Sequence, residues 1–498
     1  METEEEEPER KSKTEYFKIF ERNVSLPSDI RDVLVVGGGI AGLTCAYKLI
    51  TTDESLNIQI LEANTVIGGQ VGNTKLGDIG GKWFSDKQHH IRSLMKQLGV
   101  PVQKREIKRP DLQRCWDIDQ GVLSYLVKFE LNRYIDELEL TIGYFRPGSF
   151  DVDHESRSMY SNICNRLFFN KSRLFMSNVV RIVTGADARQ VSYLHFMSIC
   201  YTCGGLLNII TLYFEHPDTL LGLQSQQLFD QLTNKMKYVR SEFNCKVTSI
   251  RQNRRWVEVT CAEQPEKYNA RFVVIAIPYN KINEISFEPP LPEEFTPHCV
   301  ETKPHFITCF IAKYPDGHWR EKGYSGSFVS GDPFIIGYEY KKNLYSGIIV
   351  HEEGLEDSRN VVLQALSVHF GRKMLKPIEY HEKMYELTCL PSKPFTKPFK
   401  RIIWSSSSTS ATWYRGCLGG AVQSGMRAAT DVMYALRPQR LSYHHLSDVN
   451  HRCHEFKIRV SEYEVMKSKL NLYNVTYYGL FASFVVVSLV KLSGKIKT

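Results

Sequence analysis

The sequence lacks several features that mark special classes of protein. It has no long Lys/Arg run, and a formal charge of +8 over 498 residues is mild, so nucleic acid is a poor first choice of partner. It has no repeats or low-complexity tracts, and 32 Gly and 20 Pro are ordinary numbers, which excludes collagen-like and fully disordered chains. The composition, 42% hydrophobic and 24% charged, is that of a globular protein with two or three domains.

The N-terminal end lacks a targeting signal. Residues 1–28 open on an acidic stretch, without the basic and apolar regions of an export signal or the Arg-rich character of a mitochondrial presequence. We interpret this segment as a solvated acidic tail. The twelve cysteines fit a reduced compartment better than a disulfide framework. Cys200 and Cys203 have no second pair or histidine at zinc spacing, so we predict no metal site.

Long hydrophobic runs are scarce, with one exception near the C-terminus. Residues 472–490 are 19 consecutive uncharged positions, and a helix of this length spans about 28 Å, enough to cross a bilayer. Tyrosines lie at one end of the run and lysines lie beyond the other, as at membrane interfaces. The alternative is a C-terminal core helix. We predict a transmembrane tail, joined to the globule by a polar linker over 438–471.

A nucleotide-binding pattern begins near the N-terminus. A short apolar run over 32–36 leads into Gly37-x-Gly39-x-x-Gly42 and a helical pattern, and a second apolar strand ends in Glu62, 20 residues after Gly42. Strand, glycine turn, helix, strand and acid predict the dinucleotide-binding βαβ unit.

Each of these residues has a physical task in such a unit. Gly37 permits the tight turn, Gly39 lets the pyrophosphate approach the backbone, and Gly42 lets the helix pack closely on the strand. The helix N-terminus faces the phosphate charge, and Glu62 accepts hydrogen bonds from the ribose hydroxyls. The alternative is a glycine-rich turn without a ligand.

The segment after Glu62 favours FAD over NAD. Two further glycine pairs, Gly68-Gly69 and Gly80-Gly81, follow the acid closely. Backbone free of side chains at these points suits a long, extended cofactor.

With these motifs in view, the chain resembles the flavin-dependent amine oxidases, and more narrowly the monoamine oxidases, over about 31–436. The family's glycine fingerprint is followed by L-E-A, G-G-R and D-L-G-G segments, which read here as Leu61-Glu62-Ala63, Gly68-Gly69-Gln70 and Asp78-Ile79-Gly80-Gly81. The likeness continues at 88–99, 272–278, 287–292 and 419–429.

The resemblance implies an α/β fold in which an FAD/NAD(P)-binding Rossmann-like domain is interleaved with an α+β substrate domain, plus the C-terminal transmembrane helix. The FAD-binding domain is expected to use residues 30–105, 236–285 and 397–437. The substrate domain is expected to use residues 106–235 and 286–396. Within the middle FAD-binding piece, short apolar stretches over 245–250, 257–260 and 272–277 read as strands.

The resemblance also implies a reaction and a set of contacts. The reaction is oxidation of a small amine by FAD and O₂ to an aldehyde, with release of hydrogen peroxide. Beyond the βαβ unit, the expected FAD contacts are Gly68, Gly69, Gly80, Gly81, Val247 at the adenine end, and Gly419, Gly420 and Ala421 at the start of the last helix. The similar family tail implies the mitochondrial outer membrane with the globule facing the cytosol, and a homodimer is left open.

The expected catalytic positions depart from the family. Thr308 stands at the position of the lysine that holds a water beside the flavin. Pro394 stands at the position of the cysteine that bonds the flavin, so FAD is expected to be non-covalent. Phe395 takes the position of one of two tyrosines that sandwich the amine. The other position falls on Gly416 or, by a shift of one residue, on Cys417.

Departures also affect the FAD site. Asn64 and Gln70 stand where the family commonly has arginines near the diphosphate, so two charge-assisted bonds become neutral ones. Residues 404–409 lack the glycine of the family's F-A-G-T-E-T segment, and a Cβ there obstructs approach to a ligand. We therefore expect weakened FAD binding.

Three functions stay open at this point. The first is an amine oxidase with altered specificity and slow turnover of simple aryl-alkyl amines. The second is a weak or inactive member that keeps the fold as a membrane-anchored binding or structural protein. The third is a flavin enzyme for another substrate, such as a polyamine or an amino acid. An arginine that binds a carboxylate in the pocket would decide this reading; Arg181, Arg189 and Arg320 are candidates.

Overall fold

The computed structural model describes residue 27 and residues 29–104, 111–144, 157–215, 220–262, 266–295, 305–387, 390, 395–410 and 415–451. Most of the acidic tail, Pro394 and the apolar run over 472–490 lie outside these residues.

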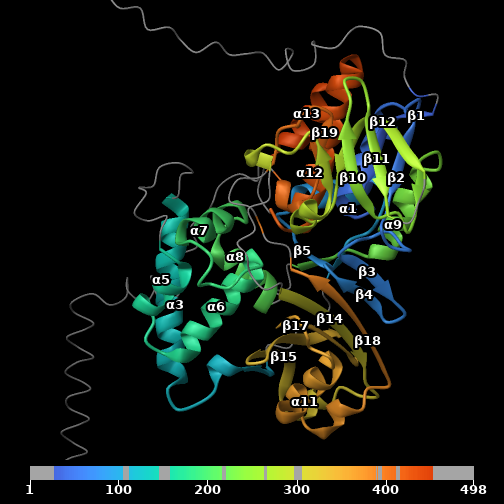
Figure 1. Ribbon diagram of the computed structural model, residues 1–498. Coiled ribbons are helices and arrows are strands. Elements are labelled where there is room, and N and C mark those ends of the chain that lie inside the picture. Colours follow the sequence, from blue (N-terminus) through green and yellow to red (C-terminus); the bar gives the residue numbers. More distant parts are fainter. Residues whose placement is uncertain are drawn as a thin grey trace, which may run out of the picture.

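An eight-stranded sheet forms the centre of one domain, in the upper half of Figure 1. Its main path runs β13-β10-β11-β12-β1-β2-β9, and β19 pairs with β12 beside that path. Strand β1 pairs in parallel with β2 and β12. The strands are β1 (Ile30–Val36), β2 (Ile58–Leu61), β9 (Arg240–Glu242), β10 (Val247–Gln252), β11 (Val257–Cys261), β12 (Lys267–Ile275), β13 (Ser286–Glu288) and β19 (Ile402–Trp404).

Both faces of this sheet are buried, which explains the continuous apolar run in β1. Val33 and Val35 pack into a helical layer, whereas Leu34 and Val36 pack into a second core on the opposite face. The helices in the first core are α1 (Ile40–Thr52), α2 (His89–Gln97), α9 (Ser225–Lys235), α12 (Leu418–Leu436) and α13 (Tyr443–Asn450). This arrangement confirms the predicted Rossmann-like α/β fold.

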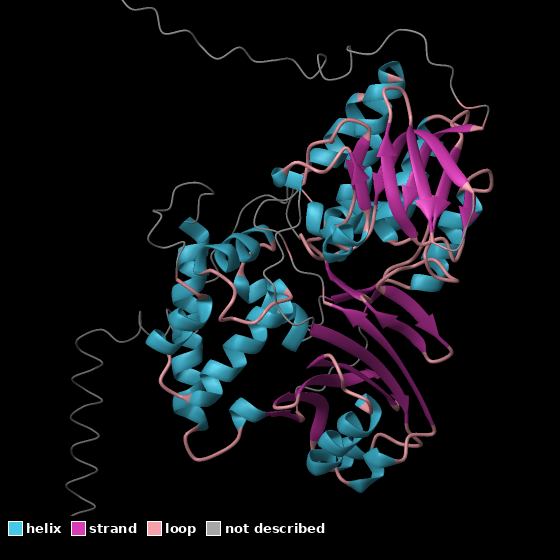
Figure 2. Cartoon of the chain, in the orientation of Figure 1, coloured by secondary structure: helices cyan, strands magenta, loops and turns pink. Residues whose placement is uncertain are grey.

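A six-stranded sheet forms the second domain, in the lower half of Figures 1 and 2. Its order is β18-β14-β17-β16-β15-β7, and all neighbours are antiparallel except β15 and β7. The strands are β7 (Gln113–Trp116), β14 (His305–Lys313), β15 (Tyr324–Gly331), β16 (Phe334–Lys341), β17 (Leu344–Glu352) and β18 (Glu379–Glu386).

Helices cover both faces of this second sheet. Helix α11 (Ser358–Phe370) packs on one face, near the short α10 (His318–Glu321). A helical layer packs on the other face. Its helices are α3 (Ser124–Tyr144), α5 (Met159–Arg166), α6 (Asn170–Thr184), α7 (Tyr193–Thr202), α8 (Leu206–Ile210) and the π-helical turn Thr211–Glu215.

Two small sheets connect the domains. The hairpin of β3 (Val71–Thr74) and β4 (Gly77–Gly80) leads into β5 (Trp83–Ser85), which pairs with β8 (Leu220–Gly222), and β8 pairs with β6 (Gln103–Lys104).

Within the described residues, no single helix is long and apolar enough to span a bilayer. One pair, Tyr193–Thr202 with Leu206–Phe214, meets the length and composition criteria together but is bent by 73°. Its apolar side chains lie in the core of the helical layer, which accounts for their composition.

Candidate functional site

The glycine turn after β1 has the geometry that the sequence predicts. Gly37 has a φ of +107°, and a Cβ there would lie 2.6 Å from the carbonyl oxygen of Ala276. A Cβ on Gly42 would lie 2.0 Å from the carbonyl oxygen of Gly37. These two glycines are therefore required by the fold itself, with or without a ligand.

Gly39 is different, because none of the described residues occupies its side-chain position. Its backbone is extended, and a methyl group added there would have the Cα of Gly69 as its nearest atom, 4.0 Å away. Gly39 and Gly68 also form a parallel bridge. Two glycine segments thus run side by side and leave their backbone open.

The N-terminus of α1 opens beside Gly39. No side chain caps this helix end among the described residues, and its first turn carries no acid. Unpaired N–H groups and the helix dipole favour an anion at such a position. The open backbone and the uncapped helix together fit the pyrophosphate of FAD.

Glu62 lies at the end of β2, as the pattern predicts. Its Oε2 accepts a hydrogen bond from the Gly38 amide at 2.6 Å, and its Oε1 accepts from the backbone and side chain of Asn64 at 2.9 and 2.7 Å. A carboxylate has about four acceptor positions, so one remains for a ribose hydroxyl. Asn64, at a family arginine position, orients Glu62 rather than contributing charge.

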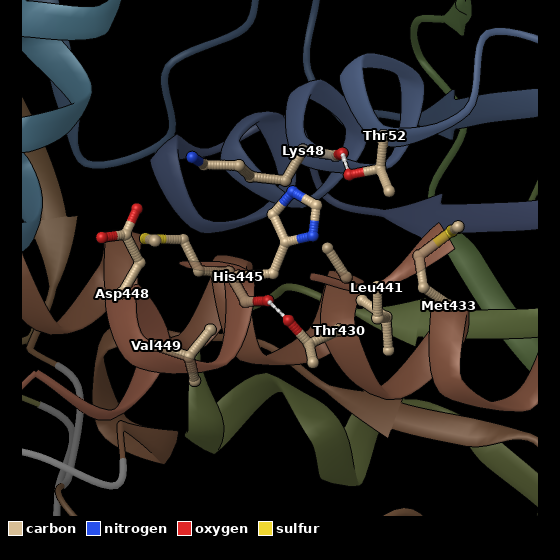
Figure 3. Close-up of a pocket in the computed structure, with 10 residues that line it drawn as sticks. Lys48, Thr52, Thr430, Met433, Leu441, His445, Asp448 and Val449 are labelled. Atoms are coloured by element: carbon tan, nitrogen blue, oxygen red, sulfur yellow. Dashed lines mark hydrogen bonds between the residues drawn. The ribbon is translucent and has the colours of Figure 1, made fainter. Parts of the chain in front are cut away.

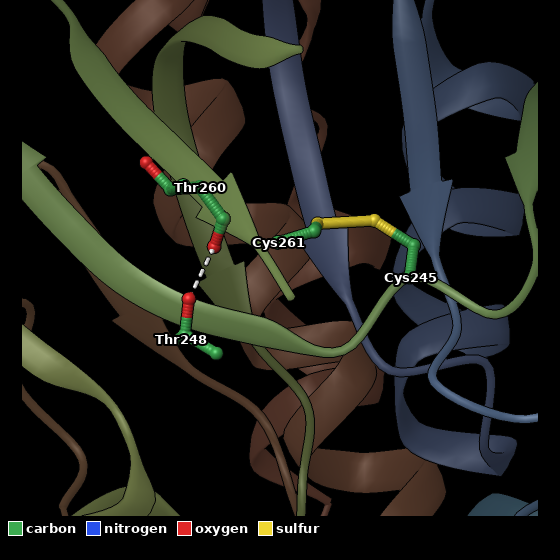
Figure 4. The surroundings of a disulfide bond; sticks show 4 residues. All are labelled: Cys245, Thr248, Thr260 and Cys261. Carbon is green, nitrogen blue, oxygen red and sulfur yellow. Dashed lines mark hydrogen bonds between the residues drawn. A yellow bond between two sulfur atoms is a disulfide. The ribbon is translucent and has the colours of Figure 1, made fainter. Parts of the chain in front are cut away.

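The expected adenine end carries a disulfide bond. Val247 is buried at the start of β10, and Cys245 just before it is bonded to Cys261 at the end of β11 (Figure 4). Seven other described cysteines are free thiols. The expectation of reduced cysteines therefore needs correction at this pair, which neighbouring antiparallel strands bring together.

The second glycine segment meets the other domain at Cys309. Gly80 has a φ of +85°, and its backbone hydrogen-bonds to the thiol of Cys309 on β14. A Cβ on Gly81 would have a methyl group of Val71 as its nearest neighbour, at 3.6 Å. This contact joins the predicted flavin segment to β14 of the six-stranded sheet.

Thr308 lies on the opposite face of β14 from Cys309. Adjacent strand residues point to opposite faces, and the residue paired with Thr308, Ile349, packs in the core against α11. The Thr308 hydroxyl pairs with Nε2 of His351 at 2.9 Å. The structure therefore does not bring Thr308 together with Gly80 or Gly81.

Two lysines lie on the Cys309 side, Lys383 of β18, which pairs with Cys309, and the buried Lys82, which the sequence analysis did not single out. The Nζ of Lys82 donates to the Ser346 hydroxyl at 2.7 Å and to the Asp78 carbonyl at 3.3 Å. It also lies 4.2 Å from the centre of the Tyr340 ring. Burial lowers the pKa of Lys82 to about 8, although Cys309 and Asp78 act in the opposite direction. The sequence signal that could have identified Lys82 is its position directly after Gly80 and Gly81.

The lowered pKa of Lys82 predicts a pH dependence of stability. Between pH 8 and 10.5 the unfolded chain binds the proton that the folded chain has lost, so the free energy of unfolding rises with pH. Relative to Lys82→Met, we expect the wild-type protein to gain about 2 kcal/mol between pH 7.5 and 10. Urea unfolding of both proteins at each pH measures the difference, and a constant difference would contradict the lowered pKa.

The last helix starts where the sequence predicts the final FAD contacts. Gly419, Gly420 and Ala421 form the first turn of α12, after Cys417 at the N-cap. The Gly419 amide donates to Oε1 of Gln88 at 2.9 Å. Gln88, which lies just before α2, thus fixes the position of this helix end.

Phe395 lies in an aromatic cluster of the first domain. Its ring is 5.2 Å from that of Tyr279, 5.3 Å from Trp404 and 5.7 Å from Phe295. Cys417 is half-buried and its thiol hydrogen-bonds to Cys203, after α7. Phe395 and Cys417 are the two positions predicted to form the cage that sandwiches the amine. They lie in different parts of the fold, one in an aromatic core and one at a helix end.

The comparisons with known proteins agree with this geometry. The profile of the family described as flavin containing amine oxidoreductase matches residues 40–347, more than half of the chain. The chain belongs to this family. As a flavin amine oxidoreductase it is an FAD-dependent enzyme, which confirms the predicted family and cofactor.

Curated relatives of this flavin amine oxidoreductase align over most of its length. The probable flavin-containing monoamine oxidase A of Dictyostelium discoideum is 25% identical over 464 residues, covering 83% of this chain and 100% of the relative. Amine oxidase [flavin-containing] B of Homo sapiens is 25% identical over 465 residues, covering 81% of this chain and 86% of the relative.

Solved structures share the fold. Cyclohexylamine oxidase from Brevibacterium oxydans superposes with a TM-score of 0.68 at 19% identity, covering 82% of this chain and 99% of that one. A wild-type putrescine oxidase bound to putrescine gives a TM-score of 0.65 at 20% identity, covering 81% and 99%.

Two buried arginines near α12 were also missed by the sequence analysis. Arg427, on the core face of α12, donates to the carbonyl oxygens of Thr409 at 2.5 Å, Trp404 at 2.8 Å and Phe395 at 3.5 Å. It thereby holds the serine-rich segment of the flavin amine oxidoreductase in place. Arg415, three residues before α12, makes no such bonds. Arg415 lies between an aromatic residue and a glycine in the sequence, so no helix or strand periodicity pointed to its burial.

A small surface pocket lies elsewhere on the FAD-binding domain (Figure 3). Lys48 and Thr52 of α1 line one side, and Thr430, His445 and Asp448 line the other. Lys48 and Thr52 lie on the second half of α1, away from Gly39. The pocket is therefore separate from the pyrophosphate site.

Proposed function

We propose that the protein is an FAD-dependent oxidase of small amines that holds FAD without a covalent bond. The observation that carries the proposal is the open backbone at Gly39 beside the uncapped N-terminus of α1, in a chain of the flavin amine oxidoreductase family. When bound, FAD supplies the redox chemistry, taking a hydride equivalent from the amine and passing it to O₂.

The protein's own residues position and polarise the reactants. Gly39, Gly69 and Glu62 hold the nucleotide half of FAD. At the other end of the site, Gln88 fixes the start of α12 and Arg427 fixes the serine-rich segment before it. Lys82 places a buried ammonium on the sheet face that meets Gly80, opposite to the face of Thr308. We therefore propose that Lys82 provides the positive charge on this side of the site, which the uncharged Thr308 cannot supply.

Anaerobic mixing of the purified yellow protein with benzylamine, tyramine and serotonin tests the proposal. We expect flavin bleaching by at least one amine, and acid precipitation should leave the flavin in the supernatant. Lys82→Met should slow bleaching about 100-fold, because a well-placed charge is removed. The matched variant Thr308→Val should stay within about threefold of wild type.

Each contrary result has a defined meaning. Flavin bound but not bleached by any amine would favour the alternative of a member without amine oxidation. Flavin retained on the acid pellet would refute non-covalent binding. Equal effects of the two substitutions would refute the role of Lys82.

We also propose that residues 472–490 anchor the protein in the mitochondrial outer membrane with the globule in the cytosol. The support is the uncharged run with lysines beyond it. Truncation after Ser468 should release soluble protein from membranes. If the full-length chain is already extracted at alkaline pH, the proposed anchor is wrong.

A further inference from the structure

Arg415 is a buried cation between the two domains. Its side chain is 1% exposed, and its charge is felt by His195 of α7, Cys203 after α7 and Tyr279 after β12. Burial lowers its pKa to about 10, so the guanidinium is charged at neutral pH.

Two of the three nitrogens of the Arg415 guanidinium lack a hydrogen-bond partner within the described part of the chain. Its Nε and Nη2 have no hydrogen-bond partner, and no carboxylate lies close enough to affect its charge. The Cys203 thiol donates to the carbonyl oxygen of Arg415 at 3.2 Å rather than bonding to the guanidinium. A hydrogen bond with Cys417 and the charge of Arg415 both lower the pKa of Cys203. A buried cation left in this state is costly unless a ligand completes it.

The arginines proposed from sequence are already paired. Arg181 and Arg189 lie 3.1 and 3.7 Å from the carboxylate of Asp187. Arg320 forms an ion pair with the buried Glu339. None of the three is free for a substrate, which leaves Arg415 as the open guanidinium among the described arginines near the predicted cage.

The unpaired atoms have the arrangement of an anion site. Nε and Nη2 form one edge of the guanidinium, and two parallel N–H groups on such an edge match the two oxygens of a carboxylate. Arg415 is two residues before Cys417, a predicted cage position that is only half-buried. An anion on Arg415 therefore lies beside the position where the amine is expected.

We infer that Arg415 binds the carboxylate of the substrate, so that the oxidised amine is an amino acid. This inference rests on the proposed amine oxidation and names its substrate class. The third function left open by the sequence is thereby favoured, through a residue that the sequence did not indicate.

Benzoate binding tests the site without catalysis. We expect benzoate to perturb the flavin spectrum of the holoprotein and to raise its melting temperature. Arg415→Gln should weaken benzoate binding about 100-fold. Arg415→Lys should weaken it less, because lysine keeps the charge but loses the two parallel N–H groups of the guanidinium. The control Arg189→Gln removes an exposed arginine and should leave binding unchanged. Equal benzoate affinities of the wild type and Arg415→Gln would overturn the inference. So would a failure of both proteins to bind benzoate.

A matched substrate pair tests the chemistry. L-Phenylalanine and 2-phenylethylamine differ only in the carboxylate. We expect anaerobic flavin reduction to be at least tenfold more efficient with phenylalanine, and Arg415→Gln should abolish that preference while reduction by 2-phenylethylamine stays within about threefold. Reduction by 2-phenylethylamine alone would overturn this inference and keep the proposed function. A protein that binds benzoate but reduces flavin with neither would refute the proposed function and keep the anion site.

Discussion

Arg427→Met should lower the free energy of unfolding by about 3–5 kcal/mol, whereas Arg415→Met should raise it by about 2 kcal/mol. The two side chains are both buried, and burial lowers both pKa values to about 10. Arg427 satisfies the carbonyl oxygens of Thr409, Trp404 and Phe395, which would lose their donor in a low-dielectric interior. Arg415 satisfies no such group through Nε or Nη2.

Urea unfolding of both variants measures the two effects. Arg189→Met serves as the control, because this side chain is 65% exposed and should change stability by less than about 0.5 kcal/mol. A loss for Arg415→Met as large as that for Arg427→Met would assign Arg415 a structural role. If Arg415→Met raises the free energy of unfolding, Arg415 is not needed for folding. This result is expected of a residue that is kept because it binds a ligand.

Gly39→Ala should abolish tight FAD binding and leave the apoprotein folded. The extended backbone of Gly39 accepts alanine, and in the described part of the chain the atom nearest to the new methyl group would be the Cα of Gly69, at 4.0 Å. The methyl group would instead occupy the space through which the pyrophosphate approaches. We expect FAD affinity to fall at least about 100-fold, a loss of about 3 kcal/mol.

Gly42→Ala is the matched variant with the opposite outcome. Its methyl group would lie 2.0 Å from the Gly37 carbonyl oxygen and 3.1 Å from side-chain atoms of Val35 and Ala276. We expect a loss of about 3 kcal/mol in apoprotein stability. Thermal unfolding of both apoproteins and flavin fluorescence titration separate the effects. Wild-type FAD affinity in Gly39→Ala would show that the cofactor does not pass this backbone.

The nucleotide half of the site could be predicted from sequence because its determinants are local. Gly37, Gly39, Gly42 and Glu62 lie within 26 residues, and each requirement concerns a turn, a helix start or a strand end. The same holds for Gly419 and Gly420 at the start of α12. Local patterns determine these features, so no knowledge of distant partners is needed.

The catalytic half depends on contacts between distant segments. The face on which Thr308 lies follows from the pairing of β14 with β17 and β18, and a shift of one residue would reverse it. The importance of Lys82 depends on Ser346, 264 residues away. The unpaired state of Arg415 depends on its neighbours at α7 and at Tyr279, both far away in the sequence, and a sequence motif cannot encode a missing partner.

The disulfide shows an intermediate case. The strands beside the two cysteines were both predicted, at 245–250 and 257–260, yet their pairing register was not. In that register Val247 lies opposite Cys261, which brings the sulfur of Cys245 within bonding distance. Compartment arguments from the whole chain could not anticipate a bond made by one hairpin.

The two bonds from the β4–β5 segment into the six-stranded sheet have a mechanical consequence. Lys82 is bonded to Ser346 on β17, and the next residue, Trp83, donates to the Tyr338 hydroxyl on β16 at 2.7 Å. Neighbouring side chains anchored on two adjacent strands restrain both translation and twist. We therefore expect the two domains to stay attached to each other at this edge, so that any domain motion that admits a substrate is a rotation about the β4–β5 segment.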